Sequence, residues 1–511
     1  MKKEIYFFYS SLPGSMFGVL LDQAKKAIMD EKKKIYFVMC QGFFSHCLSN
    51  PKGNLGICEL CKFQTKHLLS DQLGKEVTFI NLSDHYSETH SLEDIQINSS
   101  KDVKRYKYKG IEIGYGVLSS YIYITRNQNP KVDDKSKVYF QNQILQSIKL
   151  IDAFEAIITG IQPDEISSFN GRFNEIKPVF ELAIQKKIPV NLYEFESVGY
   201  KKYAKVVFKN TLPHSVSGNR WKFDYLWNEP SLTKDKKVAL SKEFYQNKRL
   251  GKAAGDKVYV KGMPSGVLPD NWDTIKRNIV LFNSSEDEFV SIGKEWEDLA
   301  LFDSQFDGMV YIFEKYKEEE NTHFYLRIHP NLKNVPYRYH TDLYNLEKKY
   351  KNVTVIGPKS NISTYDLIDA SDLVIVFGST VGLEASYSGK PVILLGCSWY
   401  YYENVCYVPR SIEEFDKLFQ KELLPIKNEE MFLKLGLFFY YRNATHIDKE
   451  TLFKYIDFNI TVYRFFGKEV YGYNYQKIFF SKKIYALGVA FVKAISLLLL
   501  KNKFVIPLNE E

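Results

Sequence analysis

The 511-residue sequence has only 6 cysteines and 5 tryptophans, and it has no long apolar segment near its start. So few cysteines in a chain of this length argue against a disulfide framework, and we expect the thiols to be reduced. The first apolar run, in MKKEIYFFYSS, covers only about five residues, whereas the apolar region of a secretory signal peptide is longer. We therefore expect a first β-strand there and a cytoplasmic protein.

A strong excess of charge is also absent, because 69 lysines and arginines face 61 acidic residues and leave a net charge of +8. This modest balance fits an anionic partner such as a nucleotide, an acidic glycan or an acidic lipid surface, and a solvated lysine face equally well. No recognition motif or concentrated basic and aromatic patch supports nucleic-acid binding. With 45% hydrophobic and 15% aromatic residues, the chain has enough apolar material for about two packed domains.

Strand-like and helix-like segments alternate in both halves of the chain. In the first half, residues 4–9 and 35–39 have the apolar pattern of strands, and residues 16–29 between them have helical spacing. This alternation predicts an α/β fold with two Rossmann-like, doubly wound domains that face a cleft. We place the N-terminal domain with its connection at residues 1–275, the C-terminal domain at residues 276–445, and a helical tail at residues 446–511.

The stretch SDLVIVFGSTVGLEASYSGKPVILLGC, residues 371–397, predicts a strand, a glycine turn, a helix and a second strand. Gly378 allows a ligand to approach the backbone, and Ser379 or Thr380 can cap the helix that follows. Because N–H groups at a helix N-terminus favour an anion, this turn is a candidate phosphate site. The alternative is an ordinary turn between strand and helix that binds no ligand.

Polar residues also follow other predicted strands. Asn170, Arg172 and Glu196 follow two strands of the first half, and His329, which precedes a proline, follows one of the second half. In an open α/β sheet such positions line the ligand crevice, so Asn170, Arg172 and Glu196 are candidates. The alternatives are a structural turn at Asn170 and Arg172, an ion pair of Arg172 with Glu196, and a His329 that only caps backbone groups.

Four of the six cysteines, Cys40, Cys47, Cys58 and Cys61, lie close together in the sequence. Cys58 and Cys61 have the spacing of a zinc knuckle, whereas the interval from Cys40 to Cys47 is too long for the usual zinc pair. Buried thiols that line a loop are the alternative to a structural metal site. The sequence leaves open whether these cysteines bind a metal.

The end of the chain carries an apolar stretch at residues 484–500, which is interrupted by Lys493 and flanked by further lysines. This stretch is marginal for crossing a bilayer, and its basic flanks favour an interfacial helix on the inner face of the cytoplasmic membrane. The alternative is a C-terminal helix that packs back on the N-terminal domain.

The order of motifs along the chain resembles a known group of enzymes. An NGR after a strand, an acidic residue after the next strand, IHPN, and FGSTVGLEASYSGKPVI follow one another. In this order they resemble bacterial surface-polysaccharide glycosyltransferases of GT-B architecture, the capsule-biosynthesis proteins distantly similar to Kdo transferases, bacterial sialyltransferases and polyglycerophosphate transferases.

The resemblance implies roles for particular residues. His329 and the turn at Gly378, Ser379 and Thr380 would bind the donor phosphate, and Glu384 would hold the donor ribose. Related proteins carry His-Glu-Arg-Gly where this chain has Phe195-Glu196-Ser197-Val198, so the acidic position matches and its neighbours do not.

The resemblance implies transfer of a sugar from a nucleotide-sugar donor to a glycan or lipid-linked acceptor, in the synthesis of a capsule, O-antigen or similar polysaccharide. No cofactor is expected, and the absence of a persuasive Asp-x-Asp motif agrees with metal-independent catalysis. Glu196 is our candidate for the carboxylate that acts as general base or nucleophile. The alternatives are a nucleotide-sugar epimerase of the same shape and a non-catalytic nucleotide- or glycan-binding component of an assembly complex.

Overall fold

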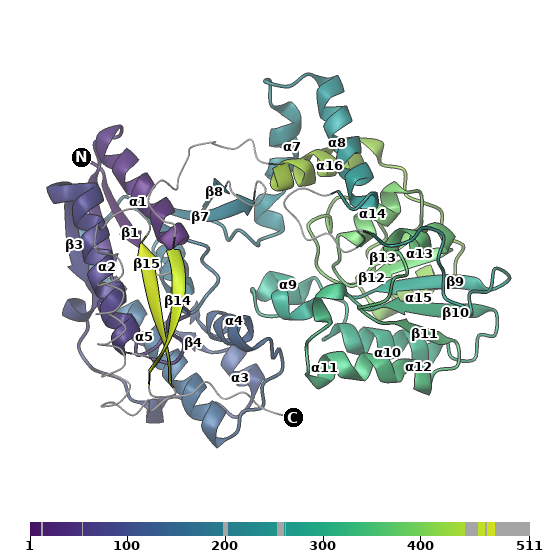
Figure 1. The fold of residues 1–511 in the computed structure, drawn as a ribbon, viewed down its shortest axis with the longest axis horizontal. Helices are drawn as coiled ribbons and strands as arrows, with labels where there is room; N and C mark the ends of the chain where they lie inside the picture. The colour runs from purple at the N-terminus through teal and green to yellow at the C-terminus, as the bar shows by residue number, and fades with distance from the viewer. Residues whose placement is uncertain are drawn as a thin grey trace.

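Two β-sheets, each flanked by helices, dominate the molecule (Figure 1). One sheet forms within the first 209 residues and the other between residues 277 and 394. The computed structural model describes the chain except for residues 12–13, 54, 198–202, 253–259, 261, 445–457, 466–467 and 476–511.

The first sheet has the strand order β3-β2-β1-β6-β7-β8. Every neighbouring pair is parallel except β7 with β8, which is antiparallel. The chain therefore builds one side of the sheet from its centre and then crosses over to build the other side. The strands are β1 (Lys3–Phe7), β2 (Lys34–Met39), β3 (Val77–Asn81), β6 (Glu165–Phe169), β7 (Val190–Ser197) and β8 (Tyr203–Lys209).

The long helix α5 (Asp134–Ile161) packs on this sheet. Asp133 begins it by accepting hydrogen bonds from the backbone N–H groups of Lys135 and Ser136. Its apolar side chains recur every three or four residues and face the core, where Phe154 meets Phe7 of β1 with ring centroids 5.0 Å apart. The other elements of this half are α1 (Gly14–Met29), α2 (Leu55–Leu73), α3 (Ser100–Lys104), β4 (Lys107–Tyr108), β5 (Ile111–Glu112), α4 (Gly114–Thr125) and α6 (Lys177–Gln185).

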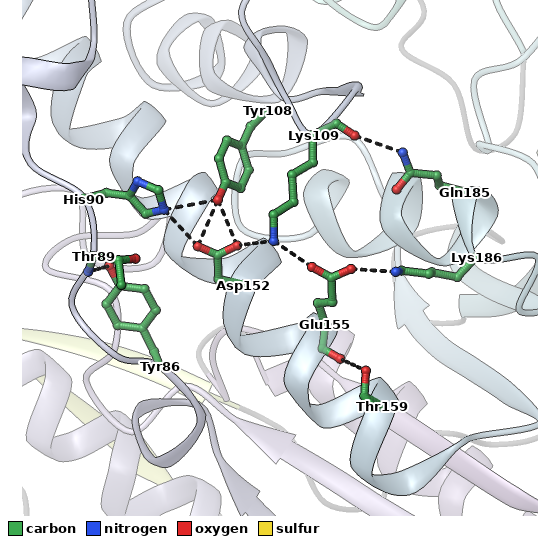
Figure 2. Close-up of polar contacts among 10 residues, drawn as sticks. All are labelled: Tyr86, Thr89, His90, Tyr108, Lys109, Asp152, Glu155, Thr159, Gln185 and Lys186. Atoms are coloured by element: carbon green, nitrogen blue, oxygen red, sulfur yellow. Dashed lines mark hydrogen bonds and ion pairs between the residues drawn. The ribbon is translucent and has the colours of Figure 1, made fainter.

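The short hairpin of β4 and β5 is tied to α5 by a cluster of polar side chains (Figure 2). The Tyr108 hydroxyl donates to Asp152 at 3.0 Å, and the same carboxylate lies 2.8 Å from Lys109 Nζ and 3.0 Å from His90 Nε2. Lys109 also pairs with Glu155 at 2.7 Å. Because these groups are satisfied by one another, the cluster is a structural connection, and it lies away from the cavity described below.

The second sheet has five parallel strands in the order β11-β10-β9-β12-β13. Counted from its own first strand, this is the order 3-2-1-4-5 that the first sheet also shows, and it is the order of Rossmann-like domains. The predicted architecture of two doubly wound α/β domains is confirmed. The strands are β9 (Arg277–Phe282), β10 (Thr322–Arg327), β11 (Val353–Ile356), β12 (Leu373–Val376) and β13 (Val392–Leu394). The helices between and after them are α9 (Lys294–Asp298), α10 (Gln305–Lys315), α11 (Arg338–Thr341), α12 (Leu346–Lys349), α13 (Thr364–Ala370), α14 (Val381–Tyr387) and α15 (Ile412–Phe419).

Three helices from distant parts of the chain close one side of the second domain (Figure 1). They are α7 (Trp221–Asn228), α8 (Lys234–Arg249) and α16 (Glu429–Ala444). Ser241 on α8 donates to the carbonyl of Leu433 on α16 at 2.6 Å, and the apolar side chains of all three helices join the core beneath β9 and β12. The domain boundary at residue 275 stays a prediction, although α7 and α8, which precede it, pack with the second sheet.

Two parts of the structure differ from the expectation. Residues 205–275 lose the clear alternation of apolar and polar residues, yet Tyr203–Lys209 form β8, which pairs along β7 at the edge of the first sheet. The expected helical tail is wrong for β14 (Phe458–Phe465) and β15 (Lys468–Tyr475), which form an antiparallel hairpin, because β-branched and aromatic residues favour strands. The apolar stretch at 484–500 lies outside the described residues, and among those described no helix has the length and apolarity needed to cross a membrane.

Candidate functional site

The centre of the second sheet contains a topological switch point. The chain leaves β9 toward β10 on one side and later returns to place β12 on the other side. In open α/β sheets a ligand binds outside the carboxyl ends of the strands at such a point. The carboxyl ends that meet here lead to Asn283 after β9, to His329 after β10 and to Gly378 after β12.

The turn at Gly378 requires a glycine. Its φ of +105° lies in a region that residues with a side chain rarely adopt, and a Cβ there would lie 2.5 Å from the carbonyl oxygen of Cys397. A Cβ on Gly396 would in turn lie 3.0 Å from the carbonyl of Phe377. The loops after β12 and β13 therefore pass in backbone contact, and this contact fixes the mouth of the crevice.

Ser379 and Thr380 lead from this turn into α14. The Ser379 hydroxyl accepts a hydrogen bond from the N–H of Val381, the first residue of α14, at 3.3 Å, whereas the N-cap position itself is Thr380. The carbonyl of Ser379 accepts a hydrogen bond from the buried hydroxyl of Tyr400. Thr380 makes no side-chain cap and is partly exposed at the mouth of the crevice.

His329 is held in place from two sides. Its backbone N–H donates to the side-chain oxygen of Asn283 at 2.7 Å, which joins the ends of β10 and β9. Its Nδ1 accepts a hydrogen bond from the N–H of Asn331 at 3.2 Å, so a neutral imidazole carries its proton on Nε2. The expected capping role of His329 is thus present. Since β9 lies between β10 and β12, His329 and Gly378 start about 10 Å apart, two strand spacings.

Glu384 lies in α14 with its carboxylate inside the domain, where it accepts a hydrogen bond from the hydroxyl of Tyr365 on α13. This contact and burial raise the pKa of the Tyr365 hydroxyl well above its usual value. Lys390, in the same motif, donates to the carbonyls of Asp369 and Ser371 at 2.7 and 2.8 Å and so completes the C-terminus of α13. The structure gives both residues structural partners, and a contact of Glu384 with ribose stays a prediction.

The candidates of the first domain are only partly brought together. Asn170, in a left-handed conformation with φ of 66°, donates to the carboxylate of Glu194 at 2.5 Å. Arg172 donates from Nε to the hydroxyl of Ser119 at 3.0 Å, and burial lowers its pKa to about 10 against the opposing effect of Glu288. Glu196 lies within β7, where its backbone pairs with Ala204, and its side chain lies outside the described structure.

A cavity of about 450 Å³ opens between the two domains. Its wall in the first domain includes Lys104 on α3 and Leu118 on α4, and its floor in the second domain reaches Phe377 and Gly396 beside the switch point. Three basic residues of the first wall, Lys101, Lys104 and Arg105, give this side of the cavity a positive charge.

Glu286 lines this cavity, and it was not among the site residues predicted from the sequence. Its carboxylate accepts hydrogen bonds from Gln128 Nε2 at 2.8 Å and from the N–H of Gln305 at 3.1 Å. Burial nevertheless raises the pKa of Glu286 above its ordinary value. Among the described residues, two buried atoms beside it have no hydrogen-bond partner, the Gln128 side-chain oxygen and the Gln305 side-chain nitrogen.

The contact between the domains centres on the C-terminus of α4, which the sequence did not indicate. Arg126 there reaches the loops after β9 and β10, bonding to Asp287, to Ser285 and to the carbonyl of Asn331. Next to it, the hydroxyl of Ser119 donates to the carbonyl of Ser291 at 2.6 Å. In the second domain, the run of polar residues from Asn283 to Glu286 directly after β9 could have marked this contact in the sequence. Nothing in the sequence around Arg126 marks the half of the contact that lies in the first domain.

No group of three His, Cys, Asp or Glu side chains among the described residues is arranged to hold a metal ion. The walls of the crevice offer a backbone turn, hydroxyls, amides, an imidazole and basic side chains. Such groups bind phosphate and sugar oxygens and can stabilise negative charge that develops on a leaving group.

Residues 276–416 match the sequence profile of a family described as capsule polysaccharide biosynthesis protein. This range holds the whole second sheet and each of the strand ends at the switch point. The resemblance to capsule-biosynthesis proteins is therefore confirmed for this part of the chain. No curated relative matches the sequence.

Solved structures with partial similarity are of two kinds. The KpsC β-Kdo 2,4 transferase of Thermosulfurimonas dismutans has 16% identity and a TM-score of 0.34, covering 53% of this chain and 79% of its own. The β-Kdo 2,7 transferase of the same KpsC has 13% identity and a TM-score of 0.29, with coverages of 67% and 89%. The UDP-GlcNAc 2-epimerase from Methanocaldococcus jannaschii has 15% identity and a TM-score of 0.27, with coverages of 86% and 100%. Similarity at this level says nothing about which reaction this chain performs.

Proposed function

We propose that this protein is a glycosyltransferase that moves a sugar from a nucleotide-sugar donor to a growing capsule or related surface polysaccharide. The observation that carries this proposal is the position of the motif residues. His329 and the Gly378 turn follow β10 and β12, the two strands that flank β9 at the switch point, within the residues that match the capsule-biosynthesis family.

The donor phosphates would sit against the turn of Gly378, Ser379 and Thr380. There the backbone comes close to a ligand because Gly378 has no side chain, and Thr380 offers a hydroxyl at the mouth. The Nε2–H of a neutral His329 would donate to a phosphate oxygen, and a protonated ring would add charge as the glycosidic bond breaks. These residues need no metal ion for this role, and the nucleotide sugar is a substrate, so we propose no cofactor.

The sugar would occupy the cavity between the domains. Its hydroxyls can bond to polar side chains that line this cavity, among them Gln128, Gln305 and Glu286. Lys101, Lys104 and Arg105 share this cavity with Glu286, Glu297, Asp298 and Asp303, and Lys104 pairs with Glu297, so the charge of the lining does not select an acidic sugar.

The acceptor hydroxyl needs a base, or the sugar needs a carboxylate nucleophile. We propose Glu196, near the carboxyl end of β7 in the first domain, for this role. Glu286 is a second carboxylate to test, because it lines the cavity and a raised pKa suits a general base that works near neutral pH.

Product analysis tests the proposal directly. The purified chain is incubated with radiolabelled CMP-, UDP-, GDP- and CDP-sugars and with membranes from a capsule-producing cell as the acceptor source. Label that enters a glycan or lipid-linked product supports a transferase, and a His329→Ala variant should abolish it. Interconversion of free nucleotide sugars without incorporation would overturn the proposal in favour of an epimerase, and binding without turnover would leave only an assembly component.

A further inference from the structure

Four cysteines converge on one small cavity in the first domain, far from the switch point of the second sheet. Cys40 follows directly after β2, Cys47 lies in the loop beyond it, and Cys58 and Cys61 lie on α2. Residues three apart on a helix share a face, so α2 presents both of its thiols to the same side. The four cysteines together line a cavity of about 30 Å³.

The loop that carries two of the thiols is held by its own hydrogen bonds. Cys47 and Asn50 form an antiparallel bridge, with the N–H of Asn50 donating to the carbonyl of Cys47 at 2.8 Å. The N–H of Phe43 donates to the carbonyl of Cys40, also at 2.8 Å. The loop is anchored to the rest of the domain because the N–H of Leu48 donates to the buried carboxylate of Glu175 at 2.8 Å.

Polar donors are aimed at the sulfur atoms. The Asn50 side-chain nitrogen donates to Cys58 Sγ at 3.3 Å, and the hydroxyl of Ser10, just after β1, lies 3.3 Å from Cys61 Sγ. Hydrogen bonds to sulfur are the usual outer contacts of thiolate ligands, since they stabilise the negative charge of the bound thiolate. Cys397 and Cys406 of the second domain are buried elsewhere and do not line this cavity.

We propose that Cys40, Cys47, Cys58 and Cys61 form a four-thiolate metal site, and that zinc is the ion it takes. Four sulfur ligands select zinc or an iron–sulfur cluster, and a cavity of about 30 Å³ suits one ion, whereas a four-iron cluster needs more room.

No three of the described thiols are already placed around a common point. Binding therefore requires the cysteine side chains to turn between staggered rotamers, and one such turn moves a sulfur by about 3 Å with the backbone fixed.

The site would stiffen the mouth of the first sheet. Tyr9 and Ser10 after β1 line the same cavity, and β1 borders the switch point of this sheet, because β6 lies on its other side. A metal that joins the end of β2, the loop and α2 would hold the surface beside that point in one conformation. Its role would be structural, because four protein ligands leave no position for a substrate.

Metal analysis of the full-length protein tests the site. The chain is purified without chelators, in a reducing and oxygen-free buffer, and its metals are measured by mass spectrometry. We expect about one zinc per chain, and we expect Cys58→Ser and Cys61→Ser to weaken zinc affinity by more than about 100-fold. Asn50→Ala, which removes only an outer contact, should weaken it by about 10- to 100-fold. The matched controls Cys397→Ser and Cys406→Ser should keep the full zinc content.

A second measurement covers variants that fail to fold. Cobalt added to the wild-type chain after zinc removal should give the intense visible bands of a tetrahedral, sulfur-rich site. The proposal would be overturned if the purified protein contains no metal, shows six reactive thiols after unfolding, and gives no such spectrum when cobalt is added. Iron with inorganic sulfide in place of zinc would support the four-thiolate site and overturn the assignment to zinc.

Discussion

The guanidinium of Arg126 in the first domain binds the carboxylate of Asp287 in the second through two hydrogen bonds, at 2.7 and 3.2 Å. Asp287 has only 5% of its side chain exposed, and the pair raises the pKa of the arginine. Asp287 directly follows Glu286 on the cavity rim, so the contact that joins the domains also sets the position of a candidate site residue.

Removing this contact should destabilise the protein. In Arg126→Ala the carboxylate of Asp287 stays buried without its cation. We expect a loss of about 3 kcal/mol in the free energy of unfolding, which is the lower end of the range for a buried ion pair. The lower end applies because the Arg126 side chain is itself 36% exposed. We expect a clear fall in the melting temperature. Lys294→Ala, which breaks an exposed pair with Asp298, is the control and should melt like the wild type. If both variants have the melting temperature of the wild type, the stability of the protein does not depend on the ion pair between Arg126 and Asp287.

The phosphate site predicts losses in nucleotide affinity. His329→Ala, and the double change Ser379→Ala with Thr380→Ala, should each weaken binding by about 5- to 150-fold, because a charge-assisted hydrogen bond is worth about 1–3 kcal/mol. CMP, UDP, GDP and CDP are first tested for a rise in the melting temperature of the protein. The affinity of each variant for the nucleotide that raises it is then measured by calorimetry. Ser411→Ala removes an N-cap far from the crevice and controls for loss of a cap alone. Unchanged affinity in both site variants contradicts the assignment.

Glu286 predicts a pH dependence of stability. Its pKa is raised in the folded protein, so the folded chain binds more protons than the unfolded chain between the ordinary carboxyl value and the raised one. Stability should therefore decrease as the pH rises through that interval. Glu286→Gln, whose amide can pair with a reoriented Gln128, should reduce this slope and be at least as stable as the wild type above it; a remaining slope comes from Glu4 and Glu175, whose pKa values burial also raises. Denaturant unfolding from pH 4 to 8 measures the slope, with the exposed Glu318→Gln as control, and parallel curves for wild type and Glu286→Gln would refute the prediction.

A catalytic carboxylate at Glu196 predicts a separation of binding from turnover. Glu196→Gln should keep the donor affinity and the melting temperature and should lower the transfer rate by about 100-fold or more, the contribution of a general base. All three quantities are measured on one purified preparation. A structural role would lower stability and binding together, and near wild-type transfer would remove Glu196 from the mechanism.

The sequence at residues 484–500 predicts membrane attachment. Deleting residues 484–511 should move the protein from the membrane fraction to the soluble fraction, because each lysine near anionic lipid adds about 1 kcal/mol to the insertion of the apolar face. Nucleotide binding should remain. Aggregation of the shortened chain would instead identify this segment as part of the core.

The central strands of both sheets could be predicted because they are buried and read as short apolar runs, as in Leu373–Val376. Their order could not be predicted, since each pairing is set by contacts between distant segments. That His329 and Gly378 follow the two strands on either side of β9 became visible only with that order. Arg126 shows the limit most clearly, because its partner Asp287 lies 161 residues away and nothing in its own surroundings marks it.

The local sequence pattern was also insufficient where the same residues suit both a strand and an exposed connection. Residues 203–209 and 458–475 have aromatic, β-branched and charged residues in alternation, which suits strands but also fits exposed connections. Glu286 was passed over because it follows a plain run of Asn283, Ser284 and Ser285. Its carboxylate became a candidate only through Gln128 of the other domain.

The packing of α16 on α7 and α8 has a consequence for the order in which the molecule is made. Ser241 and Leu433, which join these helices, are separated by 192 residues. At a synthesis rate of about 5–20 residues per second, α8 leaves the ribosome about 10–40 seconds before its partner. During that interval every strand of the first sheet is already available to pair, whereas the apolar side of α7 and α8 must wait. The first domain can thus finish folding during translation, and the second is completed only as the chain nears its end.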